Sequence, residues 1–259
     1  MNQNSINDFL RVAREAAKAA CELILSYYNG KFDIEIKQDQ TPVTVADRRA
    51  EQVIRDTISS AFPEHGIFGE EYGSDNKHAE YLWLIDPIDG TKSFIQRYGM
   101  FSTQIALMHQ GVLIVGVSCA PAMNELVWAT LGGGAFDENG PLHISAVDTI
   151  DQSSISTGNI QSLAAGDHWP ALGRVLAKAN RTRGYGDYYH YHRLAAGQLD
   201  AVIESDVNIL DIAALTLIVT EAGGVFTDLD GGAINLETRS VLAATPALHA
   251  ALSTELGRA

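Results

Sequence analysis

One short segment constrains this chain more than any other, an apolar run that is followed at once by two aspartates. Residues 81–85 (YLWLI) have the length and composition of a buried strand. Residues 86–91 (DPIDGT) come next, and Pro87 biases Asp86 away from helical backbone. The two carboxylates therefore cannot share a helix face. We expect a tight turn that brings Asp86, Asp89 and an intervening backbone carbonyl to one point.

These oxygen atoms suit hard cations such as Mg²⁺, Mn²⁺ or Ca²⁺ better than they suit zinc. The alternative is a solvated turn in which Asp86 and Asp89 only cap the following segment, because Asp, Pro and Gly are ordinary turn residues. Taken alone, the segment leaves both interpretations open.

The composition predicts a globular protein with a substantial core. The chain has 259 residues, of which 46% are hydrophobic, and this is enough for one large domain or two small ones. Its formal net charge of −14 argues against nucleic acid or an anionic membrane as a partner. In a protein with that charge, a site that binds a phosphorylated substrate would need metal ions to neutralise its negative charge.

Two further features bear on where such a protein works. Cys21 and Cys119 lie far apart in the sequence and predict buried free thiols rather than a disulfide framework. Residues 1–14 are polar and charged at short intervals, and no uninterrupted apolar run approaches the length of a membrane span. We expect a cytoplasmic protein.

The hydrophobic spacing divides the chain into two halves. Residues 1–142 predict an α+β half, with long helices on an antiparallel sheet and Gly132–Gly134 as a flexible turn that ends the sheet. Residues 143–259 predict an α/β half in which buried strands alternate with helices. The expected strands are 32–36, 66–71, 81–85, 103–108, 112–120, 125–130, 153–157, 182–185, 200–204, 225–228 and 240–244, and the expected helices are 6–28, one opened by Thr44, 169–179, 187–196, 211–222 and one from Pro246.

Three more acidic positions each have two interpretations. Asp47 lies three residues after Thr44, so it fits a capping box at a helix start. Glu70 and Glu71 follow a short strand, where a pair of acids is often only solvated. Asp211 opens a strongly apolar helix, where a carboxylate caps free N–H groups but also leaves an oxygen for a cleft between the halves.

Four motifs occur together and in order. They are GEE at 69–71, DPIDGT at 86–91 with Phe94 three residues on, DIAA at 211–214 and EAGG at 221–224. Together they resemble the signatures of the inositol monophosphatase superfamily. The resemblance covers essentially the whole chain and implies a layered αβαβα sandwich of the sugar phosphatase type. One departure is Leu210, where the family commonly has tryptophan.

The resemblance implies a set of roles in phosphate ester hydrolysis. Glu70, Asp86, Asp89, Asp211 and the Ile88 carbonyl would bind two or three Mg²⁺ ions, which can clamp the attacking and leaving oxygens of an in-line displacement. Asp47, Glu70 and Thr91 would form the catalytic set that positions and deprotonates the attacking water. The Gly90 and Thr91 N–H groups would hold the phosphate of a small metabolite. Family members also imply a homodimer.

The substrate is predicted from weaker signals. TKSFI at 91–95 and GDYY at 186–189 look more like the histidinol-phosphate phosphatase branch than the inositol branch. Asp187 suits a substrate with an ammonium group, since a buried charge must be paired, and Glu204 could contact a hydroxyl or share the amine. Asp187 could instead be a helix cap and Glu204 a solvated charge. His190 and His192 are taken as ordinary histidines, because oxygen-rich magnesium sites do not recruit imidazole.

The predicted activity is therefore a magnesium-dependent phosphate monoesterase that releases L-histidinol from L-histidinol phosphate in histidine synthesis. The alternatives are an inositol-1-monophosphatase, a broad sugar-phosphate phosphatase and, less favoured, a 3′,5′-bisphosphate nucleotidase. A non-catalytic sensor of metal or phosphate could also keep this fold. The presence of Asp47, Glu70 and Thr91 together favours an enzyme.

Overall fold

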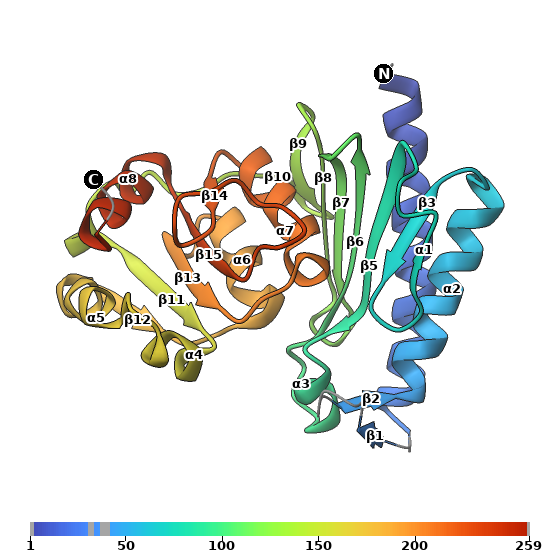
Figure 1. The fold of residues 1–259 in the computed structure, drawn as a ribbon, viewed down its shortest axis with the longest axis horizontal. Helices are drawn as coiled ribbons and strands as arrows, with labels where there is room; N and C mark the ends of the chain where they lie inside the picture. The colour runs from blue at the N-terminus through green and yellow to red at the C-terminus, as the bar shows by residue number, and fades with distance from the viewer. Residues whose placement is uncertain (1–2, 31–33, 37–41, 258–259) are drawn as a thin grey trace.

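The computed structural model describes residues 3–30, 34–36 and 42–257, which form five alternating layers of helix and sheet (Figure 1). Helices α1 (Gln3–Tyr28) and α2 (Val45–Ala61) cover one face of an eight-stranded sheet. Helices α6 (Asp187–Ala195) and α7 (Ile209–Glu221) lie between that sheet and a five-stranded sheet. Helices α5 (Trp169–Lys178) and α8 (Pro246–Glu255) cover the outer face. This arrangement confirms the predicted αβαβα sandwich.

The larger sheet has the strand order β10-β9-β8-β7-β6-β5-β3-β4, and all neighbours are antiparallel except β3 and β5. Its strands are β3 (Gly66–Gly69), β4 (Gly73–Asp75), β5 (Tyr81–Asp89), β6 (Ser102–His109), β7 (Val112–Ala120), β8 (Glu125–Thr130), β9 (Gly134–Asp137) and β10 (Gly140–Leu142). A two-stranded ribbon of β1 (Ile34–Ile36) and β2 (Pro42–Thr44) precedes it, and the predicted strand start at Phe32 lies outside the described residues.

The smaller sheet has the order β12-β11-β13-β15-β14. Its strands are β11 (Ser154–Gly158), β12 (Arg181–Arg183), β13 (Ala201–Ser205), β14 (Val225–Thr227) and β15 (Ser240–Ala244). Strand β11 is parallel to β12 and β13, whereas β15 is antiparallel to its neighbours. The short helices are α3 (Thr91–Ile95), α4 (Ile160–Ala165) and the 3₁₀ turns Pro121–Met123 and Ile150–Gln152.

Strand β5 is apolar at consecutive positions because both faces of its sheet are covered. Trp83 and Ile85 pack into the core under α1 and α2, while Leu82 and Leu84 pack into the core formed with α6 and α7. Successive side chains of a strand point to opposite faces, so each face buries every second residue. Helix α7 is buried on nearly all sides for the same reason, since it lies between the two sheets.

Two local predictions were wrong. We expected a tight turn after Ile85, but β5 continues to Asp89 with a register shift between Asp86 and Asp89. A bulge in a paired strand re-aims side chains without ending the ladder. We also expected Gly132–Gly134 to end the sheet. Gly132 and Gly133 do lie in a turn, but β9 begins at Gly134, and β9 and β10 extend the sheet.

The two predicted halves share a core that includes residues from both sides of the boundary at 142/143. At one close approach, a Cβ on Gly116 of β7 would lie 2.7 Å from the Ala214 carbonyl oxygen of α7, so glycine allows the helix to reach the sheet. The boundary itself stays a prediction. No helix among the described residues is long and apolar enough to cross a membrane.

Candidate active site

Three aspartates meet where the larger sheet faces α7. Asp86 and Asp89 lie at the end of β5, and Asp211 lies in the first turn of α7. One carboxylate oxygen from each lies within 4.8 Å of the others. Asp86 and Asp89 are 3% and 9% exposed, so the cluster is held largely away from water.

Each aspartate is oriented by donors from a different part of the chain. The Ile88 N–H donates to Asp86 Oδ1 at 2.9 Å, and the Tyr188 N–H at the start of α6 donates to Asp89 Oδ2 at 3.0 Å. Asp211 and Asn208 form a capping box, in which the Asn208 N–H donates to Asp211 Oδ2 at 3.0 Å. The predicted capping role of Asp211 is therefore confirmed, and it leaves the carboxylate beside Asp86 and Asp89.

The electrostatics of this cluster are dominated by like charges. Burial raises the pKa of Asp86 and of Asp89, and neighbouring carboxylates raise both further. Burial is also the largest cause that raises the pKa of Asp211, to about 7, against the opposing hydrogen bonds from Asn208. Glu70 is exposed and lies beside this cluster, where its charge and its side-chain hydrogen bond raise the pKa of Asp86.

This donor set fits divalent cations. All the ligand atoms are hard oxygens, and none of the ion pairs formed between described residues includes Asp86, Asp89 or Asp211. Buried like charges are costly unless a counter-charge is present. The arrangement therefore calls for positive charge at the point where the three carboxylates meet.

Asp47 and Thr91 lie together beside the end of β5. The buried Asp47 closes a capping box with Thr44, as predicted, and its Oδ2 accepts the Thr44 N–H at 2.8 Å and the Thr44 hydroxyl at 2.6 Å. Its other oxygen, Oδ1, lies 3.4 Å from the Thr91 hydroxyl. Thr91 also donates to the Ile88 carbonyl at 3.0 Å. Burial raises the pKa of Asp47, and Glu70 adds to that effect.

Gly90 and Thr91 form the start of α3. Gly90 is the N-cap residue with φ +86°, and a Cβ there would lie 2.8 Å from the Met100 carbonyl oxygen. Only glycine therefore fits without displacing the segment that precedes β6. Phe94, the last residue of the first motif, is fully buried under α1 and fixes α3 against the core.

Asp187 and Glu204 are two further carboxylates close to Asp89. They line a cavity of about 40 Å³ together with Asp89, Asn159, Tyr191, Val207, Asp211, Ile212 and Leu215. Asp187 begins α6 with φ +47°, and no side-chain hydrogen bond caps this helix. Burial, then the charge of Glu204, raises the pKa of Asp187 to about 6. Glu204 is only 3% exposed, so the alternative of a solvated charge was wrong.

The two histidines of α6 were interpreted as ordinary, and the structure gives each a specific carboxylate partner. His190 Nε2 lies 3.0 Å from Glu204 Oε2, and His192 Nδ1 lies 2.9 Å from Glu125 Oε2. Both histidines are buried. The sequence analysis did not predict these pairs. Two histidines in a helix that is expected to be buried do indicate that partners are present, because buried polar groups are hydrogen-bonded.

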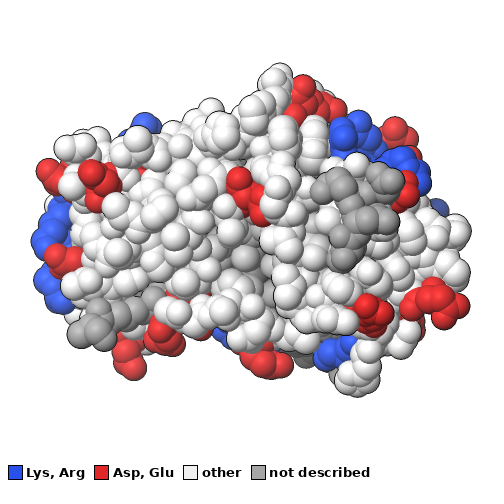
Figure 2. Space-filling model, turned by 90° about the horizontal axis from the view of Figure 1, so that it is seen from above, with Lys and Arg blue, Asp and Glu red and all other residues white. Residues whose placement is uncertain are grey.

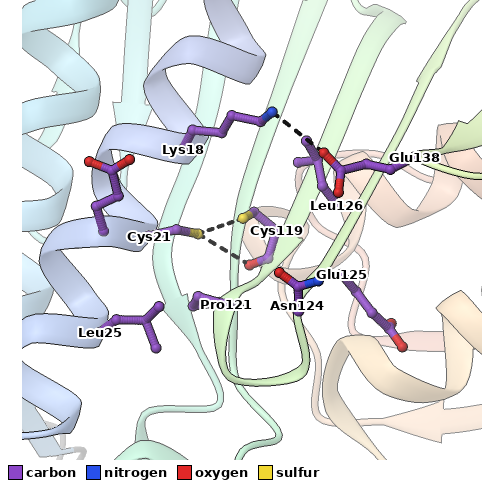
Figure 3. Close-up of a pocket in the computed structure, with 10 residues that line it drawn as sticks. Lys18, Cys21, Leu25, Cys119, Pro121, Asn124, Glu125, Leu126 and Glu138 are labelled. Atoms are coloured by element: carbon purple, nitrogen blue, oxygen red, sulfur yellow. Dashed lines mark hydrogen bonds and ion pairs between the residues drawn. The ribbon is translucent and has the colours of Figure 1, made fainter.

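A larger cavity lies on the other face of the larger sheet, between α1 and the end of β7 (Figure 3). It has a volume of about 260 Å³ and is lined by Cys21 and Cys119, both buried free thiols as predicted. None of the clustered aspartates lines it, so we place the chemistry at the carboxylates. On the face shown in Figure 2, the acidic side chains form several separate groups and the basic ones lie near the outline.

Comparison with known proteins agrees with this site. The family model described as "Inositol monophosphatase family" matches residues 5–258. A histidinol-phosphatase of Chlorobaculum parvum is 34% identical over 250 residues, 96% of either chain. An inositol monophosphatase of Dictyostelium discoideum is 34% identical over 256 residues, 95% of this chain and 94% of that protein.

Solved structures extend the agreement to the fold. The extragenic suppressor protein suhB of Bartonella henselae superposes with a TM-score of 0.89 at 29% identity, covering 96% of this chain and 98% of that one. With the buried acidic cluster, these matches show that the chain is a metal-dependent phosphoric monoester hydrolase and belongs to the inositol monophosphatase family.

Proposed function

We propose that this enzyme hydrolyses L-histidinol phosphate to L-histidinol and phosphate, a step of histidine synthesis, with Mg²⁺ as its cation. The observation that carries the proposal is the pair of carboxylates, Asp187 and Glu204, which face one cavity beside Asp89. Inositol and sugar phosphates carry no cation that would pair with them. The ammonium group of histidinol phosphate would pair with them directly.

Glu70, Asp86, Asp89 and Asp211, with the Ile88 carbonyl, are the residues that we assign to the cations. Bound cations would neutralise the phosphate and polarise its oxygens. The protein supplies the rest of the site by holding each carboxylate rigidly through its backbone donors, so that little rearrangement is needed on binding.

We assign the attacking water to Asp47 and Thr91, together with Glu70. The Asp47 Oδ1 oxygen is the one that the two Thr44 hydrogen bonds leave free, and it faces the Thr91 hydroxyl. A carboxylate with a raised pKa is a better proton acceptor than an ordinary one. The Gly90 and Thr91 N–H groups at the start of α3 are then available to orient the phosphate.

The test is a comparison of kcat/KM for L-histidinol phosphate, myo-inositol 1-phosphate, fructose 1,6-bisphosphate and adenosine 3′,5′-bisphosphate, each with Mg²⁺ and with chelator. We expect a preference for histidinol phosphate of about a hundredfold, as a hydrogen bond to a charged group contributes up to about 3 kcal/mol. Comparable turnover of inositol phosphate would sink the substrate assignment while keeping the metal site.

Asp187→Asn gives a second test at the same cavity. Because the variant keeps the shape and removes the charge, KM should rise about tenfold for histidinol phosphate and much less for inositol phosphate. If KM rises equally for both substrates, the role of Asp187 is packing alone. Inositol 1-phosphate remains the second candidate substrate, because a relative of that activity is as similar as the histidinol-phosphatase of Chlorobaculum parvum.

We also propose a homodimer, on the basis of family resemblance. Sedimentation equilibrium over a range of protein concentrations tests it directly. A monomer mass at micromolar concentration would contradict it.

A further inference from the structure

Glu204, near the end of β13, is held by two buried side chains of α6. Its Oε2 oxygen accepts the Tyr191 hydroxyl at 2.7 Å and lies 3.0 Å from His190 Nε2. Its Oε1 oxygen lies against Gly158 of the neighbouring strand, where any Cβ would overlap it. The carboxylate is therefore fixed on both sides.

The partners of His190 favour one tautomer of its neutral ring. Ser156 Oγ accepts the Tyr185 N–H at 3.2 Å, so its own hydrogen is available for His190 Nδ1 at 3.3 Å. The Nε2–H group is then the donor to Glu204. The chain Ser156–His190–Glu204 is thus a directed set of hydrogen bonds, and both Ser156 and His190 are fully buried.

His190 acts from behind the cavity and not within it. Glu204, Tyr191 and Asp187 line the cavity beside Asp89, whereas His190 does not. His190 therefore holds a carboxylate that faces the cavity without lining the cavity itself.

We propose that His190 is a positioning residue, which fixes the Glu204 carboxylate toward the cationic part of the substrate. The inference rests on the proposed function, because it assigns Glu204 to the amine. Without the His190 N–H, Glu204 Oε2 keeps only the Tyr191 hydroxyl, and the carboxylate can rotate away from Asp187. The phosphate end of the site, at β5 and α3, would be much less affected.

The experiment compares His190→Ala, His190→Gln, Glu204→Gln and the double variant His190→Ala/Glu204→Gln in the enzyme with Mg²⁺. Each is assayed on L-histidinol phosphate and on glycerol 2-phosphate, whose alcohol part is neutral. Circular dichroism and Tm show which variants keep the fold. His192→Ala is the matched control, because His192 is also buried on α6 but contacts Glu125 and Ser118 instead.

We expect His190→Ala to raise KM for histidinol phosphate about tenfold more than KM for glycerol 2-phosphate, since a hydrogen bond to a charged group is lost. His190→Gln, which keeps an N–H donor, should recover most of that difference. His192→Ala should leave the ratio of the two KM values within about twofold of the wild-type ratio. Equal losses on both substrates in His190→Ala, or the same loss of discrimination in His192→Ala, would overturn the proposal.

The double variant separates this inference from the proposed function. If His190 acts through Glu204, the effect of His190→Ala on KM disappears when Glu204 is already glutamine, whichever substrate the enzyme prefers. Additive effects would overturn the inference even if histidinol phosphate is the substrate. A wild-type enzyme with no preference for histidinol phosphate would instead overturn the proposed function, while the same cycle still decides the role of His190.

Discussion

Individual residues at this site perform two tasks at once, and Asp211 is the clearest example. It caps α7 through Asn208 and also points an oxygen at Asp86 and Asp89. Asp47 does the same at the start of α2, where it caps the helix through Thr44 and faces Thr91. A capping carboxylate is held by backbone N–H groups, so it is already rigid before any ligand arrives.

The first residue-scale prediction concerns Asp89. Asp89→Asn keeps an oxygen for the Tyr188 N–H but removes the charge, so turnover should fall about a thousandfold or more while the fold persists. Phosphate release and circular dichroism measure the two effects. Asp8→Asn, at an exposed aspartate of α1, is the control and should behave as wild type. Appreciable activity in Asp89→Asn would refute the metal assignment.

The second residue-scale prediction concerns how the stability of the metal-free protein depends on pH. The folded pKa of Asp211 is about 7 and that of Asp187 about 6, both above the value of about 4 expected when unfolded. The metal-free folded state therefore binds these protons more tightly than the unfolded state. The contribution of these two carboxyl groups to the free energy of unfolding is complete below about pH 4. It is lost as the pH rises through about 6 for Asp187 and about 7 for Asp211.

Asp211→Asn should remove part of this pH dependence. In chelator, the Tm of the variant minus that of wild type should increase between pH 4 and pH 8, by several degrees in total. Differential scanning calorimetry measures it, and saturating Mg²⁺ should abolish the increase because bound cations stabilise the ionised wild-type carboxylate. If the difference in Tm between the variant and wild type stays constant with pH, ionisation of Asp211 does not destabilise the folded protein.

At the scale of elements, α2 is tied to the strand that precedes Glu70. Glu51 of α2 is buried, bonds Arg55 at 2.8 Å and accepts the Glu71 N–H at 2.6 Å. A Cβ at Gly69 would overlap the Glu51 carboxylate, so β3 can approach α2 only with glycine at this position. The same contact sets the position of Glu70.

Gly69→Ala should therefore lower both stability, by about 1–3 kcal/mol, and activity, because Glu51 must move and the segment at Glu70 moves with it. Urea unfolding and phosphate release measure these effects. Gly173→Ala is a matched control inside α5, where a new Cβ meets nothing within 4 Å. It should stabilise the protein by about 0.5–1 kcal/mol with activity unchanged. A neutral Gly69→Ala would contradict the proposed link.

At the scale of the whole molecule, the site is assembled from both sides of a shared core. Asp89 ends a strand of the larger sheet, while its donor Tyr188 and its neighbour Asp211 belong to the two middle helices. Neither sheet can be exposed without uncovering α7, so we expect one cooperative unfolding transition. Trp83 and Trp169 lie on opposite sides of α7, so tryptophan fluorescence reports on both sides of the molecule. If the unfolding is cooperative, the fluorescence curve should coincide with the curve from far-ultraviolet circular dichroism.

Gly116→Ala tests this expectation. Its Cβ would lie 2.7 Å from the Ala214 carbonyl oxygen, so it should push α7 from the sheet and lower Tm and activity together. Two separate transitions in wild type, or an unfolding of only one sheet in the variant, would show that the halves are independent.

Much of the fold could be predicted from hydrophobic period and turn residues. Strands β7, β8 and β15 have the expected bounds, and the helix expected at 211–222 corresponds to α7. The errors arose where pairing with a neighbour overrides local preference. Pro87 predicts a break after Ile85, yet pairing with β6 keeps the strand going through a bulge to Asp89. The turn glycines 132 and 134 donate to Glu221 of α7, a partner far away in sequence.

The sequence by itself determined the kinds of ligand atoms, the helix caps at Asp47 and Asp211, and the family, because these depend on residue types at short spacing. Only the tertiary structure decided that Glu204 is buried beside Asp187, that His190 holds it, and that Asp211 reaches Asp86 and Asp89. These contacts join residues from different layers of the sandwich. Which faces of helix and sheet meet is set by packing of the whole core, and no local pattern contains that information.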